Sequence, residues 1–265
     1  MFARQAVVHL DNLAHNLSVI RTIAPGVPLC LAVKANGYGH GAVQIAHAAI
    51  ESGIEALGVA TVDEAIELRN GGVITRIILY GISSADEYFQ MAAWDIEGFA
   101  VSLSHVQGLA KAAEAAGKVI GLHLKVDTGM GRIGCTPGEA PMIAEAIARS
   151  PWLEMRGLCT HFPVAEDARE FTLGQVHALL ALADTLRKAG INPGTLHAAN
   201  SAGLCLEAQS RLGMLRPGLI AYGYAPTPDS PEASQLRPVM ELCSTLRFIK
   251  KVKAGDGKLM GFGHR

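Results

Sequence analysis

A single lysine, Lys34, stands where an apolar run gives way to a glycine-rich turn. Residues 27–33 form the apolar run, and the turn after Lys34 reads Ala35-Asn36-Gly37-Tyr38-Gly39-His40-Gly41. A buried strand that ends in this way brings an amine to the mouth of a barrel, and the turn leads into a helix. Apolar neighbours reduce the solvation of a lysine, which makes its neutral, nucleophilic form easier to reach. Lys34 is therefore the first candidate nucleophile; the alternative is a lysine that only extends its amine into solvent.

Four further polar clusters follow predicted strands. They read Lys125-Val126-Asp127-Thr128-Gly129-Met130-Gly131-Arg132, Cys159-Thr160-His161-Phe162, His197-Ala198-Ala199-Asn200-Ser201-Ala202 and Arg216-Pro217-Gly218-Leu219. Each has an ordinary explanation by itself: His161 or His197 is a satisfied core histidine, and Arg216 pairs with a carboxylate on a barrel rim. Packing alone does not readily place four such clusters and a lysine at consecutive strand ends. We therefore expect them to form one site.

The elements that position these clusters alternate between short apolar runs and alanine-rich helical segments. We expect strands at residues 7–9, 29–33, 56–60, 77–80, 98–101, 120–126, 153–159, 195–198 and 214–216. We expect helices at residues 13–23, 42–52, 63–70, 106–116, 141–150 and 173–189, with Thr61 as a helix cap. About eight such units in roughly 235 residues fit a closed α/β fold, the (β/α)₈ TIM barrel, better than an open doubly wound sheet. The turn after Lys34 is also not a G-x-G-x-x-G loop, which weakens a dinucleotide-binding alternative.

The composition limits the classes of protein to which the chain can belong. With 265 residues, 49% of them hydrophobic, the chain can bury a large core as one barrel-sized domain. The formal net charge is −1, so we expect neither nucleic acid nor a membrane surface as a partner. We also expect no bilayer-spanning segment and no secretory signal. The five scattered cysteines indicate reduced, buried thiols in a cytoplasmic protein.

Residues 32–41 closely resemble the pyridoxal-phosphate attachment motif of the alanine racemase family. The four polar clusters match the pattern of the same family, in the same order, over nearly the whole chain. The resemblance implies a barrel that binds pyridoxal 5'-phosphate, attaches it to Lys34 and interconverts L-alanine and D-alanine for cell-wall peptidoglycan. It further implies that Lys34 is the catalytic base on the D-side.

The same resemblance implies a role for each remaining candidate. The phosphate contacts implied by the family come from Tyr38, Asn200, Ser201, Gly218 and Leu219. His161 is expected against the cofactor ring, and Arg132 near the phenolic oxygen of the cofactor and the substrate carboxylate. Lys125 occupies a position at which some members of the family carry a carbamylated lysine. No metal ligand is expected.

Arg216 decides the type of chemistry, because the resemblance places it against the pyridine nitrogen of the cofactor. A guanidinium stays protonated at any working pH, so it donates a hydrogen bond and does not accept the proton of that nitrogen. The ring nitrogen then stays largely unprotonated, and the cofactor is a weaker electron sink than one paired with an aspartate. A weak sink disfavours transamination and suits the removal and return of one α proton.

The C-terminal part departs from the family pattern. We expect the barrel to occupy residues 1–226, with residues 227–265 as a proline-rich linker and the first strand of a truncated all-β domain, the strand at 239–253 and a turn at 255–257. Without partners, that strand exposes an edge. The second base of the family is a tyrosine given by the other subunit of a homodimer, and Phe262 stands where we expect it. Tyr222 and Tyr224 are the next candidates for a second base.

Three functions stay open on the sequence alone. The first is an alanine racemase, impaired if the second base is missing, with alanine, serine or another amino acid as the small-molecule substrate. The second is a barrel-only protein that binds pyridoxal phosphate without strong catalysis. The third is a lyase on the same barrel that depends on pyridoxal phosphate or on a metal held by Cys159, His161 and His123, although no ligand spacing supports a metal.

Overall fold

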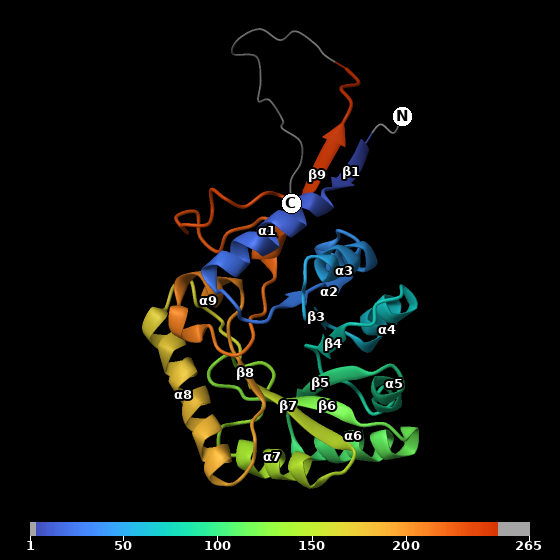
Figure 1. Ribbon diagram of the computed structural model, residues 1–265, viewed down its shortest axis with the longest axis vertical. Helices are drawn as coiled ribbons and strands as arrows, with labels where there is room; N and C mark the ends of the chain where they lie inside the picture. Colours follow the sequence, from blue (N-terminus) through green and yellow to red (C-terminus); the bar gives the residue numbers. More distant parts are fainter. Residues whose placement is uncertain (1–3, 249–265) are drawn as a thin grey trace.

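A curled parallel sheet with helices packed around its outside forms the body of the protein. The computed structural model describes residues 4–248. Figure 1 shows the sheet strands following one another in chain order, with helices between them. The seven hydrogen-bonded strands are β2 (Cys30–Ala32), β3 (Ala56–Val59), β4 (Arg76–Leu79), β5 (Ile96–Ala100), β6 (Ile120–Lys125), β7 (Leu153–Cys159) and β8 (Thr195–His197).

The eighth member of the barrel is a short extended segment around Leu215. Leu215 bridges Leu29 in parallel, and its carbonyl accepts a hydrogen bond of 2.8 Å from the Cys30 N–H. On the other side, the Arg216 N–H donates to the Ala199 carbonyl at 3.0 Å. The segment therefore joins β2 to the chain that follows β8 and closes the sheet. The predicted (β/α)₈ barrel is confirmed, although residues 214–216 make a bridge and not the regular strand that we expected.

The helices cover the outside of the sheet because each buries one apolar face. Along α1, for example, Leu13, Leu17 and Ile20 recur at helical spacing and are fully or almost fully buried. The helices are α1 (Leu10–Ile23), α3 (Ala42–Glu51), α4 (Val62–Asn70), α5 (Tyr88–Ala93), α6 (Leu103–Ala116), α7 (Ala140–Arg149), α8 (Arg169–Lys188) and α9 (Ser201–Leu206). Short turns of helix at Lys34–Tyr38 (α2), Ala208–Ser210 (η1) and Leu219–Tyr222 (η2) complete the set in the described chain. The sequence did not predict α2, α5 or α9.

A second, two-stranded sheet corrects the expectation for both ends of the chain. The first strand, β1 (Arg4–Val8), was expected in the series of barrel strands, but it pairs antiparallel with β9 (Met240–Ser244). Figure 1 shows this pair projecting beyond α1, away from the barrel. The expected strand at 239–253 is thus shorter within the described residues, and β1 covers one of its edges. The predicted turn at 255–257 and Phe262 lie outside the described residues.

The segment before β9 is fixed to α1 by side-chain hydrogen bonds. Asn16 Nδ2 donates to the Ala221 carbonyl at 3.0 Å and to the Arg237 carbonyl at 2.8 Å, and Asn16 Oδ1 accepts from the Arg237 N–H at 2.8 Å. Asn12 Nδ2 donates to the Pro238 carbonyl at 2.9 Å. Residues 227–238 run as turns without a helix, as their prolines predict. This part of the chain is therefore held against the barrel.

Two expectations from the composition, about the cysteines and about membrane-spanning helices, can be compared with the structure. All five cysteines are free; four are buried, and Cys243 on β9 is half-buried, so the expectation of burial is wrong for that one. Within residues 4–248, no helix combines the length and the apolar character that crossing a bilayer requires.

Thr61 caps α4 as the sequence predicts, and its loss gives a measurable cost. Thr61 Oγ1 accepts a hydrogen bond from the Glu64 N–H at 3.2 Å. Thr61→Ala should lower the free energy of unfolding by about 1 kcal/mol, because an N–H at the helix start then loses its partner. Urea unfolding followed by circular dichroism measures this. Thr61→Ser keeps the hydroxyl and should stay close to wild type; equal losses in both variants would contradict a capping role.

Candidate active site

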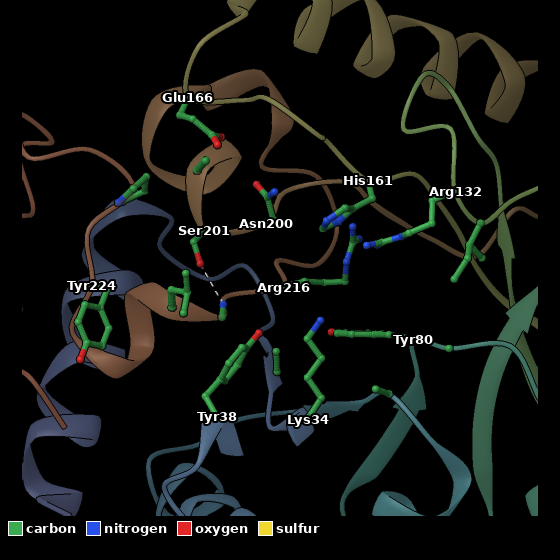
Figure 2. A pocket seen from close by; sticks show the side chains of 18 of the residues that line it. Lys34, Tyr38, Tyr80, Arg132, His161, Glu166, Asn200, Ser201, Arg216 and Tyr224 are labelled. Atoms are coloured by element: carbon green, nitrogen blue, oxygen red, sulfur yellow. Dashed lines mark hydrogen bonds between the residues drawn. The ribbon is translucent and has the colours of Figure 1, made fainter. Parts of the chain in front are cut away.

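All ten candidate residues from the sequence line one cavity at the carboxyl ends of the barrel strands. The cavity has a volume of about 560 Å³. Figure 2 shows the side chains of these strand ends converging on it from several elements. The ten residues are Lys34, Tyr38, Lys125, Arg132, His161, Asn200, Ser201, Arg216, Gly218 and Leu219. The expectation that the polar clusters meet is therefore met in the geometry, while the role of each residue is a separate question.

The turn that follows Lys34 has an unusual, left-handed backbone. Ala35, Asn36 and Tyr38 have φ values of 51°, 52° and 52°, and only Gly37, at 60°, is a residue that favours this region. A left-handed conformation costs roughly 1–2 kcal/mol for each residue with a Cβ. Such a turn persists only where its surroundings hold it in place. The sequence predicted a flexible turn here, whereas the structure has a defined left-handed one.

Glu64 on α4 supplies much of that support. Its Oε1 accepts a hydrogen bond of 2.7 Å from the Ala35 N–H, and its Oε2 accepts one of 2.6 Å from the Ala60 N–H. Asn36 adds a second contact, because its Oδ1 accepts from the Ala42 N–H at 2.8 Å. Glu64 was not among the residues that the sequence motifs indicated. The spacing of Thr61 and Glu64, which is that of a capping box, was the available signal.

Hydrogen-bond donors gather at the end of the cavity next to Tyr38. Ser201 Oγ accepts from the N–H groups of Gly218 at 3.1 Å and Ile220 at 3.4 Å, so its own hydrogen is left to donate into the cavity. A Cβ on Gly218 would lie 3.0 Å from the Tyr38 hydroxyl oxygen, which places that hydroxyl beside the Gly218 backbone. Burial raises the pKa of Tyr38, so its hydroxyl keeps its proton. Together these groups can bind an anion.

Asn200 lines the same end of the cavity, but its side chain already makes structural contacts. Its Oδ1 accepts from the Gly203 N–H at 3.0 Å and caps α9, while its Nδ2 donates to the Phe162 carbonyl at 3.1 Å. An amide nitrogen carries two hydrogens, so one is left for a ligand.

Arg216 reaches the cavity from inside the barrel and is only 6% exposed. Its Nη2 donates to the carbonyls of Thr160 at 2.6 Å and Ala198 at 2.8 Å, and its Nη1 lies 2.6 Å from His197 Nδ1. A guanidinium has five N–H bonds, of which these contacts use three. The other two, on Nε and Nη1, are available to a ligand in the cavity that Arg216 lines.

His161 and Arg132 occupy the side of the cavity opposite Tyr38 (Figure 2). Burial lowers the pKa of His161 to about 3, and the nearby positive charges of Arg216, Lys125 and Arg132 act in the same direction. The ring is therefore neutral at ordinary pH. The loop that carries Arg132 is shaped by Asp127, whose Oδ1 accepts from the Met130 N–H at 2.8 Å.

Lys125 ends β6 beside the cavity with an unusual environment for an amine. Its Nζ is buried and makes no hydrogen bond within the described residues. Burial lowers its pKa to about 8; Arg216 adds to the effect, while Cys159 and Asp127 oppose it. A buried polar atom without a partner is rare and calls for an explanation.

The sequence analysis missed two polar residues of the cavity wall, Tyr80 and Glu166. In Figure 2 the Tyr80 hydroxyl points towards the Lys34 amine. The hydroxyl donates to Cys30 Sγ at 3.0 Å, and the ring stacks on Phe99 with 5.8 Å between centroids. In the sequence, a single tyrosine after a strand cannot be distinguished from a residue that only packs in the core.

The two tyrosines considered as second bases differ in position. Tyr222 is completely buried, and its hydroxyl donates to the Ala32 carbonyl at 3.0 Å. Burial raises its pKa far above the ordinary value. Tyr224, in contrast, is 54% exposed and lines the cavity.

Of the residues considered for a metal, His123 is engaged in hydrogen bonds to other side chains. His123 bonds to Glu97 and His197, at 2.9 Å and 2.8 Å. In the described part of the chain, no group of three or more His, Cys, Asp or Glu side chains has the arrangement of a metal site.

The fold and the cavity place the chain among (β/α)₈-barrel proteins that carry a lysine amine and an anion-binding end in one cavity. Residues 8–226 match the family described as alanine racemase, N-terminal domain. The alanine racemase of Treponema denticola is 41% identical over 258 residues, which cover 96% of this chain and 68% of that protein. That of Treponema pallidum is 40% identical and covered to 70%.

Solved structures agree with the sequence relatives. An alanine racemase of Clostridium difficile 630 has a TM-score of 0.90 and 31% identity, covering 94% of this chain and 70% of that one. An alanine racemase from Streptomyces coelicolor has a TM-score of 0.89 at the same identity. The chain therefore belongs to the alanine racemase family, as the motifs indicated.

The low pKa of His161 gives a prediction about stability and pH. Its folded-state pKa of about 3 lies below the unfolded value of 6.5, so the unfolded chain takes up a proton first as the pH falls. Stability should thus be lost as the pH falls below about 6.5, by on the order of 1 kcal/mol at pH 5 from this group. His161→Asn should remove that part of the loss in urea titrations at pH 7 and 5. The same change at His177, exposed on α8, is the control; identical pH dependence in both variants would contradict the assignment.

Proposed function

We propose that this chain carries the pyridoxal-phosphate site of an alanine racemase and interconverts L-alanine and D-alanine. The observation that carries the proposal is the meeting of Lys34, Arg216 and the donors around Ser201 in one cavity. A phosphorylated pyridine aldehyde requires three kinds of group in its site. These are an amine that reacts with its aldehyde, a hydrogen-bond donor for its ring nitrogen and several donors for its phosphate. The names of the relatives agree with this reading.

The residues present fit the cofactor at each of its ends. Tyr38 and Ser201 would donate to the phosphate, with Asn200 and the backbone at Gly218 and Leu219 around it. His161 would lie against the ring, where a neutral imidazole adds no second positive charge. One of the two uncommitted hydrogens of Arg216 would be donated to the pyridine nitrogen, whose single lone pair accepts one hydrogen bond.

When bound, pyridoxal phosphate supplies an aldehyde carbon for the amino group of a substrate and a conjugated ring that withdraws electrons from the α carbon. Lys34 would hold the cofactor through its amine and would exchange the α proton of the substrate on the D-side. Arg216 would donate a hydrogen bond to the ring nitrogen without protonating it, which would keep the electron demand moderate and favour return of the proton over transamination. Arg132 would bind near the phenolic oxygen of the cofactor and the carboxylate of the amino acid.

Lys125 is proposed to be carbamylated. Its amine would add to carbon dioxide, forming an N–C bond and releasing one proton, and the resulting carbamate would carry a negative charge towards Arg132. Two observations support this step: the Nζ atom has no partner in the described chain, and its pKa of about 8 makes the neutral amine accessible. The carbamate would orient Arg132, and an uncharged N–H would replace the buried ammonium group.

The remaining expectations are part of the same proposal. We propose residues 1–226 as the part of the chain that contains the barrel, with β1 at its start paired to β9, and residues 227–265 as a linker and the start of a second, all-β domain. A small amino acid is the proposed ligand besides the cofactor, and a homodimer the proposed assembly. The proton on the second face then needs a further group. Phe262 lies outside the described residues, and Tyr224 is the described tyrosine that lines the cavity.

Borohydride reduction tests the attachment of the cofactor. The protein with added pyridoxal phosphate should be yellow, and reduction should bleach the colour and fix the cofactor covalently on Lys34. Lys34→Ala should abolish fixation and keep the fold, since the amine faces the cavity. Peptide mass spectrometry locates the adduct. Lys111, a lysine of the outer helix α6, is a suitable control for Lys→Ala; an adduct on any residue but Lys34 would overturn the assignment.

Chiral analysis of alanine tests the reaction itself. L-Alanine incubated with the protein and pyridoxal phosphate should yield D-alanine. If a second base is missing, racemisation should be slower by roughly 10²–10⁴-fold than in a relative that has both bases. Solvent deuterium should then enter D-alanine faster than D-alanine is converted to L-alanine. If Tyr224 instead serves the second face, the rate should be close to that of such a relative, and Tyr224→Phe should lower it by a similar factor. Cofactor fixation without any proton exchange would favour a barrel that only binds pyridoxal phosphate.

A further inference from the structure

Glu97 and Arg76 form an ion pair at the end of the barrel opposite the cavity. Glu97 lies near the start of β5, and Arg76 begins β4. Arg76 Nε donates to Glu97 Oε1 at 2.7 Å, and its Nη2 donates to Oε2 at 2.8 Å. The Arg76 side chain is 42% exposed, whereas that of Glu97 is 11% exposed. No chemistry assigned above uses this pair.

A series of hydrogen bonds leads from this pair through the interior of the barrel to Arg216. His123 Nε2 lies 2.9 Å from Glu97 Oε2, His123 Nδ1 lies 2.8 Å from His197 Nε2, and His197 Nδ1 lies 2.6 Å from Arg216 Nη1. Both rings are completely buried. A Cβ on Gly157 would lie 2.4 Å from His123 Nδ1, so only glycine on the neighbouring strand leaves room for this ring.

The two ends of this series determine the direction of every bond in it. Arg216 has only donors, so His197 Nδ1 is an acceptor and the hydrogen of His197 is on Nε2. That hydrogen faces His123 Nδ1, which is therefore also an acceptor. The hydrogen of His123 is then on Nε2 and faces Glu97, whose carboxylate only accepts. No two donors meet anywhere between Arg216 and Glu97.

The charges are consistent with this direction. Burial lowers the pKa of His197 well below its usual range, and Arg216 lowers it further; burial also lowers that of His123, although Glu97 opposes this. Burial disfavours the charged form of Glu97, but hydrogen bonds from Arg76 and His123 outweigh it and lower its pKa to about 2. Two neutral rings thus lie between a carboxylate and a guanidinium. Because an arginine does not release its proton, the series orients dipoles and transports no proton.

We propose that Glu97 is a positioning residue for Arg216, acting through His123 and His197. Its carboxylate fixes both rings with hydrogen on Nε2, so that His197 presents a lone pair to Arg216 in place of a hydrogen. Arg216 is thereby held in the orientation that leaves two of its hydrogens for the cavity. The inference depends on the proposed function only for the identity of the ligand; the placement of the hydrogens concerns this chain alone.

Glu97→Gln is the variant that separates this role from simple packing. A carboxamide has nearly the same size but cannot serve both neighbours. If its oxygen faces His123, its amide group opposes the N–H of Arg76 Nε. If the amide group faces His123, it opposes Arg76 Nη2, and the ring must carry its hydrogen on Nδ1. In that second case His197 is inverted as well and points a hydrogen at Arg216. Glu97→Asp keeps an ionised acceptor and should preserve the wild-type tautomers.

Nitrogen-15 NMR of the histidine side chains reads the tautomers directly. In the wild type, with or without pyridoxal phosphate, both rings should carry hydrogen on Nε2. Glu97→Gln should move hydrogen to Nδ1 in both of them and weaken the binding of pyridoxal phosphate by roughly tenfold, the worth of one hydrogen bond from Arg216. Glu154→Gln removes a carboxylate that pairs with Arg156 on the surface, and it is the matched control without effect on tautomer or affinity.

The opposite results would overturn the proposal. They are a wild-type ring with hydrogen on Nδ1, or a Glu97→Gln protein with unchanged tautomers and unchanged cofactor affinity. Equal losses of affinity in Glu97→Gln and Glu97→Asp with wild-type tautomers in both would show that only side-chain volume matters. If Glu97→Gln does not fold, the wild-type tautomers alone decide. Failure of the wild type to bind pyridoxal phosphate would contradict the proposed function, while the tautomers would still test the present inference.

Discussion

The burial of Arg216 is the constraint on which the rest of the site depends. A guanidinium taken out of water is costly unless acceptors surround it, and it cannot escape that cost by losing its proton. Two carbonyls and the His197 ring supply the acceptors. The backbone N–H of the same residue bonds to Ala199 and helps to close the barrel beside Leu215. The same residue therefore helps to close the sheet through its backbone and places a positive charge in the interior through its side chain. A shift of its backbone would also move the guanidinium.

A second constraint operates on the opposite wall, where Lys34 leaves β2. The left-handed turn of residues 35–38 is unfavourable by itself, and Glu64 and Asn36 compensate by satisfying backbone N–H groups around it. The result is a lysine whose backbone is held by side-chain hydrogen bonds, so its amine has a defined place in the cavity wall. Tyr38 gains its position from the same turn, so the amine and one donor of the anion-binding end are set together.

The sequence predicted those parts of the structure that short, local sequence patterns encode. Strands followed by polar residues are such a pattern, and the ten candidates converge because parallel strands end at the same edge of a barrel. The pairing of β1 with β9 joins residues far apart in the chain, and no local pattern encodes that register. The extended segment around Leu215 looked like the other strands, yet it pairs too briefly to count as one. Tyr80 was missed because one tyrosine after a strand is equally typical of packing.

The sequence does mark Glu97 as unusual, but only once residues 96–100 are known to form a buried strand. It interrupts the otherwise apolar stretch Ile96–Ala100, and an acidic side chain inside a buried strand is stable only with partners. The sequence cannot name those partners, because Arg76, His123 and His197 come from three other strands. In a barrel, the inward-facing side chains of the strands lie in layers. Here a series of polar side chains, from Glu97 to Arg216, crosses these layers through the interior. An apolar core would fill the same space at lower electrostatic cost. The polar line is therefore best understood as a means of carrying one fixed orientation from the lower rim of the barrel to the cavity at its upper end.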